Sequence, residues 1–334
     1  MELEGKGNEW ECIVVGGGAA GLSAALVLGR ARRRTLVIDA GEQSNRAADG
    51  IGGLLGQDGR PPAELYADGR RELAAYPSVR MVQGQVTGMA AQDGGPFRLE
   101  LAGGSVQHAD RVLLATGMQY EYPDVPGLEE LWGRSVFHCP FCHGWEARDQ
   151  TLAVLAEGDR AVHMALLLRA WTDDIVVLTN GPAGLAGLAE PQHGALAAAG
   201  VRVDERKIVE FASQDNTLAA VVFADGEELK REGVLVASAL RQRSPLATQL
   251  GVRIAPPGRV VVDAVVVDQF NRTSVPGVFA AGDVCTEMPK VAAAIADGSA
   301  AGTAIVQSLL HDQFGLPAMP WPDFAHLEET HVRD

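Results

Sequence analysis

The stretch that most constrains this chain is a glycine-rich turn between two apolar runs near its start. A short β-branched run at 11–15 is followed by GGGAAG at 16–21 and then by the largely apolar residues 22–34. A second apolar run, TLVID at 35–39, ends in an acid. This order predicts a strand, a glycine turn, a helix and a second buried strand, which is how a dinucleotide-binding fold begins.

Each part of this motif has a mechanical purpose. Gly16 permits the tight turn, Gly18 lets backbone N–H groups approach a pyrophosphate, and Gly21 lets the helix pack on the strand. The phosphates then lie at the positive end of the helix. Asp39 follows about 20 residues on, where an acid accepts hydrogen bonds from a ribose. The alternative is a glycine-rich turn that binds nothing.

The bulk composition excludes several classes of protein. The chain has 334 residues, 47% of them hydrophobic, with 43 acidic against 28 basic residues and a net charge of −15. Such a charge opposes binding to nucleic acid and to anionic lipid. We see neither a signal peptide nor an apolar run of the ~18 residues that a membrane helix needs. We therefore expect a cytoplasmic α/β protein with no nucleic-acid or membrane partner.

The chain beyond the first motif predicts a second unit of similar construction. Residues 41–62 are rich in glycine and aspartate and predict a loop. A proline-containing linker at 120–134 leads to a second strand–turn–helix–strand pattern that opens at Leu152, and another hinge follows near 241–245. Residues 260–268, VVVDAVVVD, look like a strand.

The C-terminal third complements the first motif. Gly282 and Asp283 lie where a buried apolar run ends, and an aspartate there can accept a hydrogen bond from a ribitol hydroxyl. A long helix of small residues then begins near Lys290 and Val291, and its N-terminus favours a nearby negative charge. A reduced flavin carries its negative charge at N1 and the adjoining carbonyl, so we expect the flavin at this position.

The stretch HCPFCHGWE, residues 138–146, contains two cysteines two residues apart, each beside a histidine. This pattern occurs in zinc half-sites, c-type haem attachment sites, glutaredoxin-like dithiols and flavoenzyme redox pairs. A zinc site would need two further ligands at matching spacing, and no second CxxC or HxxxH is present. Haem attachment usually goes with export, and a glutaredoxin would place a long helix here, whereas an apolar strand pattern follows almost at once. A redox pair fits the flavin motifs on both sides.

Four motifs in register resemble those of one family. GGGAAGLSAAL, ATG, CPFCHG and TSVPGVFAAGDV occur in the order found in the low-molecular-weight thioredoxin reductases. The resemblance implies an α/β protein of two Rossmann-like, three-layer nucleotide-binding domains, with a discontinuous FAD domain at 1–121 and 245–334. The second domain, 122–244, resembles a pyridine-nucleotide domain and carries the CxxC. The resemblance also implies a homodimer.

The same resemblance assigns the cofactor and the redox residues. It implies that Cys139 and Cys142 form a redox disulfide, with Cys142 facing the flavin, and that FAD is the cofactor. The residues that we expect to contact FAD are Gly16, Gly18, Ala19, Ala20, Gly21, Asp39, Ala40, Gly41, Gln43, Arg46, Val86, Ala115, Thr116, Gly117, Gly282, Asp283, Lys290 and Val291. We expect no metal site.

The second unit departs from the family where NADPH would bind. Ala156 replaces the first glycine of the expected G-x-G-x-x-A, and Glu157 adds a negative charge, which costs on the order of 1 kcal/mol near a pyrophosphate. The next strand should end in His-Arg-Arg for the 2′-phosphate, yet it ends in Thr179 and Asn180. We therefore expect a nucleotide-binding fold without NADPH.

The CxxC segment departs as well. Thioredoxin reductases have aspartate after the second cysteine, whereas this chain has His143. CPFCHGWE is similar to the flavin-dependent dithiol oxidases that close disulfides in gliotoxin and holomycin, a subgroup that also lacks the NADPH motifs. Relatives have a histidine in the early loop where this chain has Gly50-Ile51-Gly52. This difference concerns the way in which the substrate is handled.

These observations predict an FAD-dependent dithiol oxidase. Electrons would pass from a small dithiol or protein thiol to the disulfide, then to FAD and then to O2, with Cys139 attacked by the substrate thiolate. His143 would accept the proton and stabilise the thiolate, and His138 either does the same for Cys139 or only packs. Cys12 and Cys285 are most simply core residues. The alternatives are an NADPH-dependent thioredoxin or disulfide reductase with an atypical nucleotide site, and a non-catalytic flavoprotein redox sensor.

Overall fold

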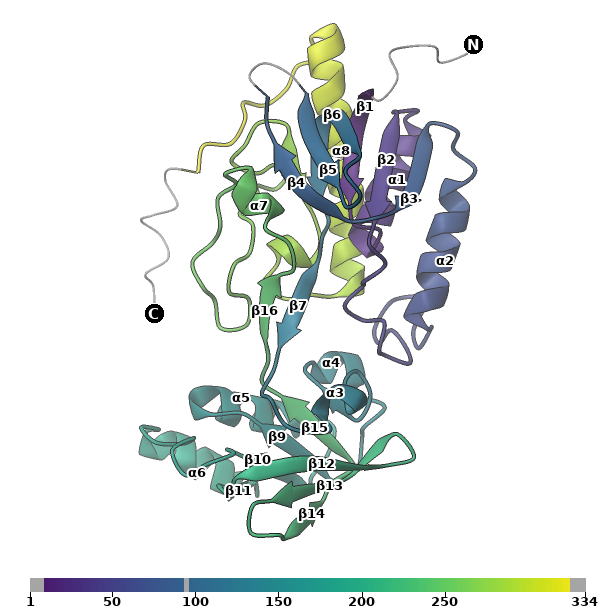
Figure 1. The fold of residues 1–334 in the computed structure, drawn as a ribbon. Helices are drawn as coiled ribbons and strands as arrows, with labels where there is room; N and C mark the ends of the chain where they lie inside the picture. The colour runs from purple at the N-terminus through teal and green to yellow at the C-terminus, as the bar shows by residue number, and fades with distance from the viewer. Residues whose placement is uncertain (1–8, 93–95, 325–334) are drawn as a thin grey trace. The chain divides into compact units, whose positions relative to one another are not determined.

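The computed structural model describes residues 9–92 and 96–324, which divide into two compact units (Figure 1). The first unit contains residues 1–44, 63–119 and 240–334, and the second contains 45–62 and 120–239. The chain passes between them in β7 (Met118–Glu121) and β16 (Ala239–Gln242), which pair as a two-stranded sheet. No helix within the described ranges is long and apolar enough to cross a membrane.

The first unit is built on a seven-stranded sheet. Its central strands β3, β2, β1 and β6 are parallel, and β17 pairs in parallel with the end of β6. The beginning of β6 instead pairs antiparallel with β5, which pairs with β4. The elements of this unit are β1 (Glu9–Val15), α1 (Ala19–Arg30), β2 (Thr35–Asp39), α2 (Pro62–Leu73), β3 (Val79–Gln83), β4 (Val86–Ala90), β5 (Phe97–Leu101), β6 (Val106–Leu114), α7 (Leu246–Gln249), β17 (Val278–Ala280), the 3-10 turn η1 (Asp283–Cys285) and α8 (Val291–Phe314).

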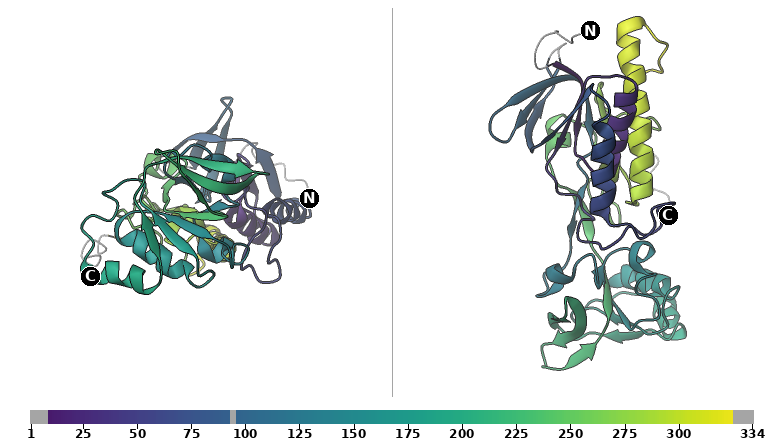
Figure 2. Two further views of the ribbon diagram at one scale, coloured as in Figure 1. Left: turned by 90° about the horizontal axis from the view of Figure 1, so that it is seen from below. Right: turned by 90° about the vertical axis from the view of Figure 1, so that its right-hand side faces the viewer.

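Both faces of this sheet are covered, because alternate side chains of its strands point to opposite sides. Val14 and Val37 pack with α1 and α8 in one core, and Cys12 is buried there as expected. Ile13 and Ile38 pack on the other side with the antiparallel strands and α7. The helices α1 and α8 run side by side, α8 in yellow and α1 in purple (Figure 2). This is the three-layer architecture that the sequence predicted.

The second unit repeats this plan. Five parallel strands in the order β11-β10-β9-β15-β8 form its sheet, with α5 and α6 on one face and a three-stranded antiparallel sheet on the other. The elements are α3 (Leu128–Leu131), β8 (Val136–Phe137), α4 (Pro140–His143), β9 (Leu152–Leu155), α5 (Gly158–Leu168), β10 (Ile175–Leu178), α6 (Glu190–Ala198), β11 (Arg202–Asp204), β12 (Ile208–Gln214), β13 (Thr217–Phe223), β14 (Glu228–Lys230) and β15 (Gly233–Val236).

Two expectations about local structure were wrong. Residues 45–62, which the sequence placed in the first domain, belong to the second unit, where Ala47 lies against Gly133 and Asp49 pairs with Arg134 at 3.4 Å. Residues 260–268 form only isolated bridges, because Val261 and Val265 are buried from an irregular segment in which Val261 bridges Leu240 of β16.

Candidate active site

The glycine-rich turn after β1 lies directly against the end of β6. The backbone N–H of Gly16 donates to Ile38 O at 2.8 Å, and φ at Gly16 is +112°. A Cβ at this position would lie 2.1 Å from Ala115 O. Only glycine therefore lets the turn pack on Ala115 and Thr116, which follow β6.

The N-terminus of α1 presents its backbone N–H groups without a side-chain cap. Gly18 is the N-cap residue and makes no side-chain capping bond, and a Cβ there would meet only Gln43 Cγ, at 3.8 Å. Gly21 packs so closely that its Cβ would lie 1.9 Å from Gly16 O. Ala19 and Ala20 form the first turn. This open helix end has the form of an anion-binding site.

The carboxylate of Asp39 organises the neighbouring loop. Its Oδ1 accepts hydrogen bonds from Gly17 N at 3.2 Å and Gly41 N at 3.0 Å, and its Oδ2 accepts one from Gln43 Nε2 at 3.2 Å. Ala40 is exposed beside it. The structure thus brings Asp39, Gly41 and Gln43 together next to the glycine-rich turn.

The turn after β17 returns to the same helix end. Gly282 has φ of +81°, and a Cβ there would lie 2.8 Å from Ala20 Cβ. Asp283 is largely shielded, and burial raises its pKa to about 6, while the charge of Arg243 opposes that rise and Asp297 adds to it. Lys290 is the N-cap of α8 and Val291 its first residue.

Two of the residues expected to contact a cofactor differ from this group, one by its unit and one by the burial of its side chain. Arg46 lies in the segment 45–62 and therefore in the second unit. Val86 begins β4 with its side chain buried in the core, so only its backbone is available for a ligand. Gly117, by contrast, lies near Ser44, with φ of +67°.

The cysteine pair lies at the start of a short helix in the second unit. Cys139 is the N-cap of α4, Pro140 occupies the first helical position, and Cys142 is one turn further on. The two Sγ atoms are 2.6 Å apart. The backbone N–H of His143 donates to Cys139 O at 3.2 Å and closes the turn. This geometry suits a pair that exchanges between dithiol and disulfide.

The ring of His143, the last residue of α4, stacks on that of Phe137. Its Nε2 is 3.2 Å from Gly133 O, so Nε2–H donates and Nδ1 keeps its lone pair. That buried Nδ1 has no hydrogen-bond partner within 9–92 and 96–324. Burial lowers the pKa of His143, although the carbonyls of Cys139 and Gly133 and the charges of Glu146 and Asp49 oppose this. His143 is therefore a neutral base at pH 7.

His138 occupies an aromatic cluster. Its ring centroid is 4.2 Å from that of Tyr120 and 5.8 Å from that of Trp132. Burial, together with the charges of His143 and Arg160, lowers its pKa to about 3. His138 thus stays uncharged at neutral pH, and this packing does not support a role as an imidazolium partner of Cys139.

A hairpin from the early loop packs on the second cysteine. Ile51 and Arg60 form an antiparallel bridge, and Gly52 lies so close to α4 that a Cβ would be 2.6 Å from Cys142 O. The side chain of Leu55 in this hairpin is fully exposed. Gly52 is thus the residue of the early loop that touches the redox pair.

The strand–helix turn of the second unit is filled by its own chain. The N–H of Gly158, at the start of α5, donates to Gly184 O at 2.7 Å. Thr179 Oγ1 donates to Gly181 O at 2.7 Å, and Asn180 Oδ1 accepts from Ile208 N at 2.9 Å. Both side chains at the end of β10 are therefore used within the fold.

Comparisons with known proteins agree with this geometry. The family model described as pyridine nucleotide-disulphide oxidoreductase matches residues 10–298. The chain belongs to this family. Thioredoxin reductase tcpT of Claviceps purpurea is 34% identical over 316 residues, which cover 92% of this chain and 97% of the relative. Thioredoxin reductase aclD of Aspergillus oryzae is 30% identical over 313 residues, covering 91% and 98%.

A solved structure extends the likeness to the fold. The oxidoreductase from Agrobacterium tumefaciens is 40% identical, with a TM-score of 0.83, and the match covers 90% of this chain and 99% of that one. This protein is thus an oxidoreductase that acts on sulfur groups, in a family of FAD-binding, thioredoxin reductase-like flavoproteins.

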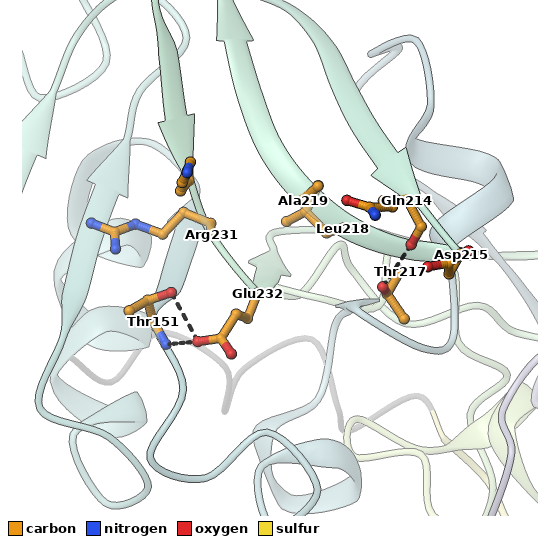
Figure 3. A pocket seen from close by; sticks show the side chains of 9 residues that line it. Thr151, Gln214, Asp215, Thr217, Leu218, Ala219, Arg231 and Glu232 are labelled. Carbon is orange, nitrogen blue, oxygen red and sulfur yellow. Dashed lines mark hydrogen bonds between the residues drawn. The ribbon is translucent and has the colours of Figure 1, made fainter.

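A pocket in the second unit of this oxidoreductase is lined by Thr151 and by residues of the segments 214–219 and 230–232, and by neither cysteine. It has a volume of about 430 Å³ (Figure 3). Glu232 closes one side by accepting hydrogen bonds from Thr151, and the guanidinium of Arg231 points away from Gln214 and Asp215. Arg231 instead pairs with Asp174 at 3.2 Å. Neither of the two cysteines nor the guanidinium of Arg231 is thus turned toward the Gln214 side of this pocket.

Sequence reasoning missed two contributors to the sites of this oxidoreductase. The contact between Gly52 and Cys142 joins residues far apart in the chain, and no local pattern announces it. Arg243, whose charge acts on Asp283, lies in a stretch taken only as a hinge. Its one signal is a basic residue next to a Ser-Pro pair, which is too common to be informative.

The hairpin contact can be tested with Gly52→Ala. Forcing a Cβ against Cys142 O costs about 1–3 kcal/mol, as overpacking does, so hairpin and helix must separate and the half-buried Cys142 becomes more accessible. We expect iodoacetamide to alkylate Cys142 of the reduced protein about tenfold faster, since 1.4 kcal/mol is tenfold. Mass spectrometry locates the label. Leu55→Ala, in the same hairpin, serves as control and leaves the rate unchanged. An unaltered rate in Gly52→Ala would show that this contact does not shield Cys142.

Proposed function

We propose that this protein is an FAD-dependent oxidoreductase that converts dithiols to disulfides through Cys139 and Cys142 and passes the electrons to O2. The observation that carries the proposal is the combination of a closely paired CxxC with a second unit whose nucleotide-binding edge is filled by its own backbone. A reductase needs an entry for hydride at that edge, whereas a dithiol oxidase does not.

The first unit fits FAD. The N–H groups of Gly18, Ala19 and Ala20 would hold the pyrophosphate at the uncapped end of α1, where a Cβ added to Gly18 would meet only Gln43 Cγ among the described residues. Asp39 would accept from the adenosine ribose, with a ribose hydroxyl taking the place of the Gln43 side-chain amide at Oδ2. The remaining expected residues of the first unit are proposed as its contacts on the same basis, Val86 through its backbone alone, whereas Arg46 belongs to the second unit and is left out. When bound, FAD supplies the capacity to accept an electron pair from thiols and to return it to O2.

The cysteines would act by thiol–disulfide exchange. A substrate thiolate attacks Sγ of Cys139, the Cys139–Cys142 bond breaks, and Cys142 leaves as a thiolate. The second substrate thiolate then attacks the substrate sulfur in the mixed disulfide and releases Cys139 as a thiolate. The substrate leaves as a disulfide and the protein keeps the electron pair in its dithiol. O2 is the acceptor that we propose for these electrons after FAD.

His143 would serve as the base in this exchange. Its Nε2–H is fixed on Gly133 O, which leaves the Nδ1 lone pair to take a thiol proton. The lowered pKa keeps the ring neutral and able to accept that proton in weakly acidic solution. We do not extend this role to His138, because its ring is held between aromatic side chains.

NADPH is not a substrate in this proposal. Gly184 O takes the Gly158 N–H that a pyrophosphate would need, and Thr179 and Asn180 supply no cation for a 2′-phosphate. Glu157, exposed at the N-cap of α5, adds a negative charge where an anion would enter. These features support the loss of NADPH binding by the second unit. The family name alone would not suggest that loss.

The surface beside the cysteines favours an apolar thiol. Phe141 is 55% exposed and Trp145 is 66% exposed, which is unusual for large aromatic side chains. Both are held in place, Phe141 edge-on against Trp171 and Trp145 beneath Arg148, whose guanidinium carbon is 4.1 Å from the ring centroid. The homodimer and cytoplasmic location expected from the sequence remain predictions.

Oxygen consumption tests the proposed reaction. We expect the FAD-loaded protein to consume O2 catalytically with dithiothreitol and to form its disulfide in equal amount. Cys142→Ser breaks the exchange, because Cys139 then has no partner, and should lower turnover at least a hundredfold while the protein still binds FAD. Catalytic reduction of a disulfide by NADPH, with no thiol-driven oxygen uptake, would contradict the proposal.

The base is tested by the pH profile of the exchange. Because burial lowers the pKa of His143, the rate at which dithiothreitol reduces the Cys139–Cys142 bond should fall only below pH ~6.5, the ordinary histidine pKa. His143→Gln should slow that step by about 10²-fold, which is a usual contribution of a general base, and move the decline upward toward the thiol pKa of ~8.5. The exposed His163 on α5 provides the control, and His163→Gln keeps the wild-type profile. An identical profile in His143→Gln would exclude His143 as the base.

A further inference from the structure

One guanidinium joins separate segments at the edge of the first unit that is proposed to bind FAD. Arg243 follows β16, and its Nη2 donates to Met118 O at 2.8 Å. Its Nη1 donates to Glu42 O and lies 3.6 Å from the Glu42 carboxylate. The loop after β2 and the segment after β6 are thus fastened to one side chain.

The two carbonyls belong to segments that we expect at the cofactor. Glu42 stands between Gly41 and Gln43, and Met118 comes directly after Gly117. Hydrogen bonds from a charged donor are stronger than those between neutral groups. By holding both carbonyls, Arg243 fixes the spacing between these two FAD-facing turns.

The charge of Arg243 also acts on a third segment, the turn at Gly282 and Asp283. Burial raises the pKa of Asp283 to about 6, and Arg243 is the group that opposes this rise. Asp297 on α8 pushes the pKa in the same direction as burial. Cys285, in the same 3-10 turn, donates to Gly282 O at 3.3 Å and carries no charge, because burial raises its own pKa.

The side chain of Arg243 is not fully satisfied by the protein. Its Nε is buried and has no hydrogen-bond partner in the part of the chain that the structure describes. Buried N–H groups almost always have an acceptor. The position of an arginine at this edge, with one N–H donor unused, is better explained by a role in ligand binding than by a contribution to stability alone.

We propose that Arg243 is a positioning residue for FAD, which holds the turns after β2 and β6 and supplies positive charge to the turn that carries Asp283. This inference rests on the FAD binding proposed above. A carboxylate is the better acceptor for a ribitol hydroxyl, so the charge of Arg243 favours the form of Asp283 that binds.

Flavin affinity tests this role directly. Full-length protein stripped of flavin is titrated with FAD, and quenching of flavin fluorescence gives the Kd. We expect Arg243→Met to raise the Kd at least tenfold and Arg243→Lys to raise it less. Arg241→Met is the matched control, because Arg241 is exposed on β16, two residues before Arg243, and its loss removes the same charge. That control should bind FAD as wild type does.

The pH dependence separates a positioning role from a structural one. The folded pKa of Asp283 is about 6, above its ordinary value, so wild-type FAD affinity should fall as the pH drops through about 6. Removing the guanidinium raises that pKa further, so in Arg243→Met the fall should begin at higher pH, and Arg243→Lys should keep the wild-type midpoint. Asp283→Asn should abolish the dependence.

The outcomes distinguish this inference from the proposed function. Wild-type protein that binds no FAD would overturn both. FAD binding by wild type and Arg243→Met with the same Kd, or a Kd raised equally at every pH, would overturn only the role of Arg243. Circular dichroism shows whether each variant is folded, and if Arg243→Met is not, the comparison of Arg243→Lys with Asp283→Asn decides.

Discussion

The architecture of the first unit depends on the close packing of Gly16 against the carbonyl oxygen of Ala115. This oxygen would be only 2.1 Å from a Cβ at position 16. The close packing lets the turn after β1 meet the end of β6, so that the carboxyl ends of adjacent parallel strands form one edge. Gly282 adds the end of β17 by packing on Ala20. The uncapped start of α1 then lies among all three segments, and the proposed FAD site is a consequence of this convergence.

The second unit has the same strand–turn–helix arrangement as the first, but the hydrogen bonds at the ends of its strands differ. Its strand–turn–helix begins as in the first unit, but the Gly158 N–H bonds to Gly184 O, and the end of β10 is occupied by internal bonds of Thr179 and Asn180. The second unit thus has the nucleotide-binding fold, with a backbone hydrogen bond at the turn where we propose that no nucleotide binds. What this unit contributes is the platform for Cys139 and Cys142. In the proposed function, the two similar units therefore have separate roles. The first binds the cofactor, and the second carries the cysteines that exchange with the substrate.

The sequence predicted those features that depend on residues close in the chain. The glycine turn and the two Rossmann-like units follow from local patterns, and the structure has them, whereas the short helix at the CxxC was not predicted. The grouping of residues 45–62 with the second unit and the contact between Gly52 and Cys142 could not be predicted, because they arise from packing between distant segments. The run at 260–268 has strand composition, yet it makes only isolated bridges and buries Val261 and Val265 from an irregular segment. The contacts of Arg243 could not be predicted either, because the carbonyl groups that it binds are far from it in the sequence.

The most direct test of the account is an anaerobic titration of the FAD-loaded protein, followed by admission of air. We predict that a small dithiol bleaches the flavin absorbance through the cysteine pair, that NADPH does not, and that air restores the colour over repeated cycles. Rapid, stoichiometric bleaching by NADPH would contradict the account and identify a reductase. Bleaching by dithiol with only one slow return of colour would equally contradict catalysis and indicate a redox sensor.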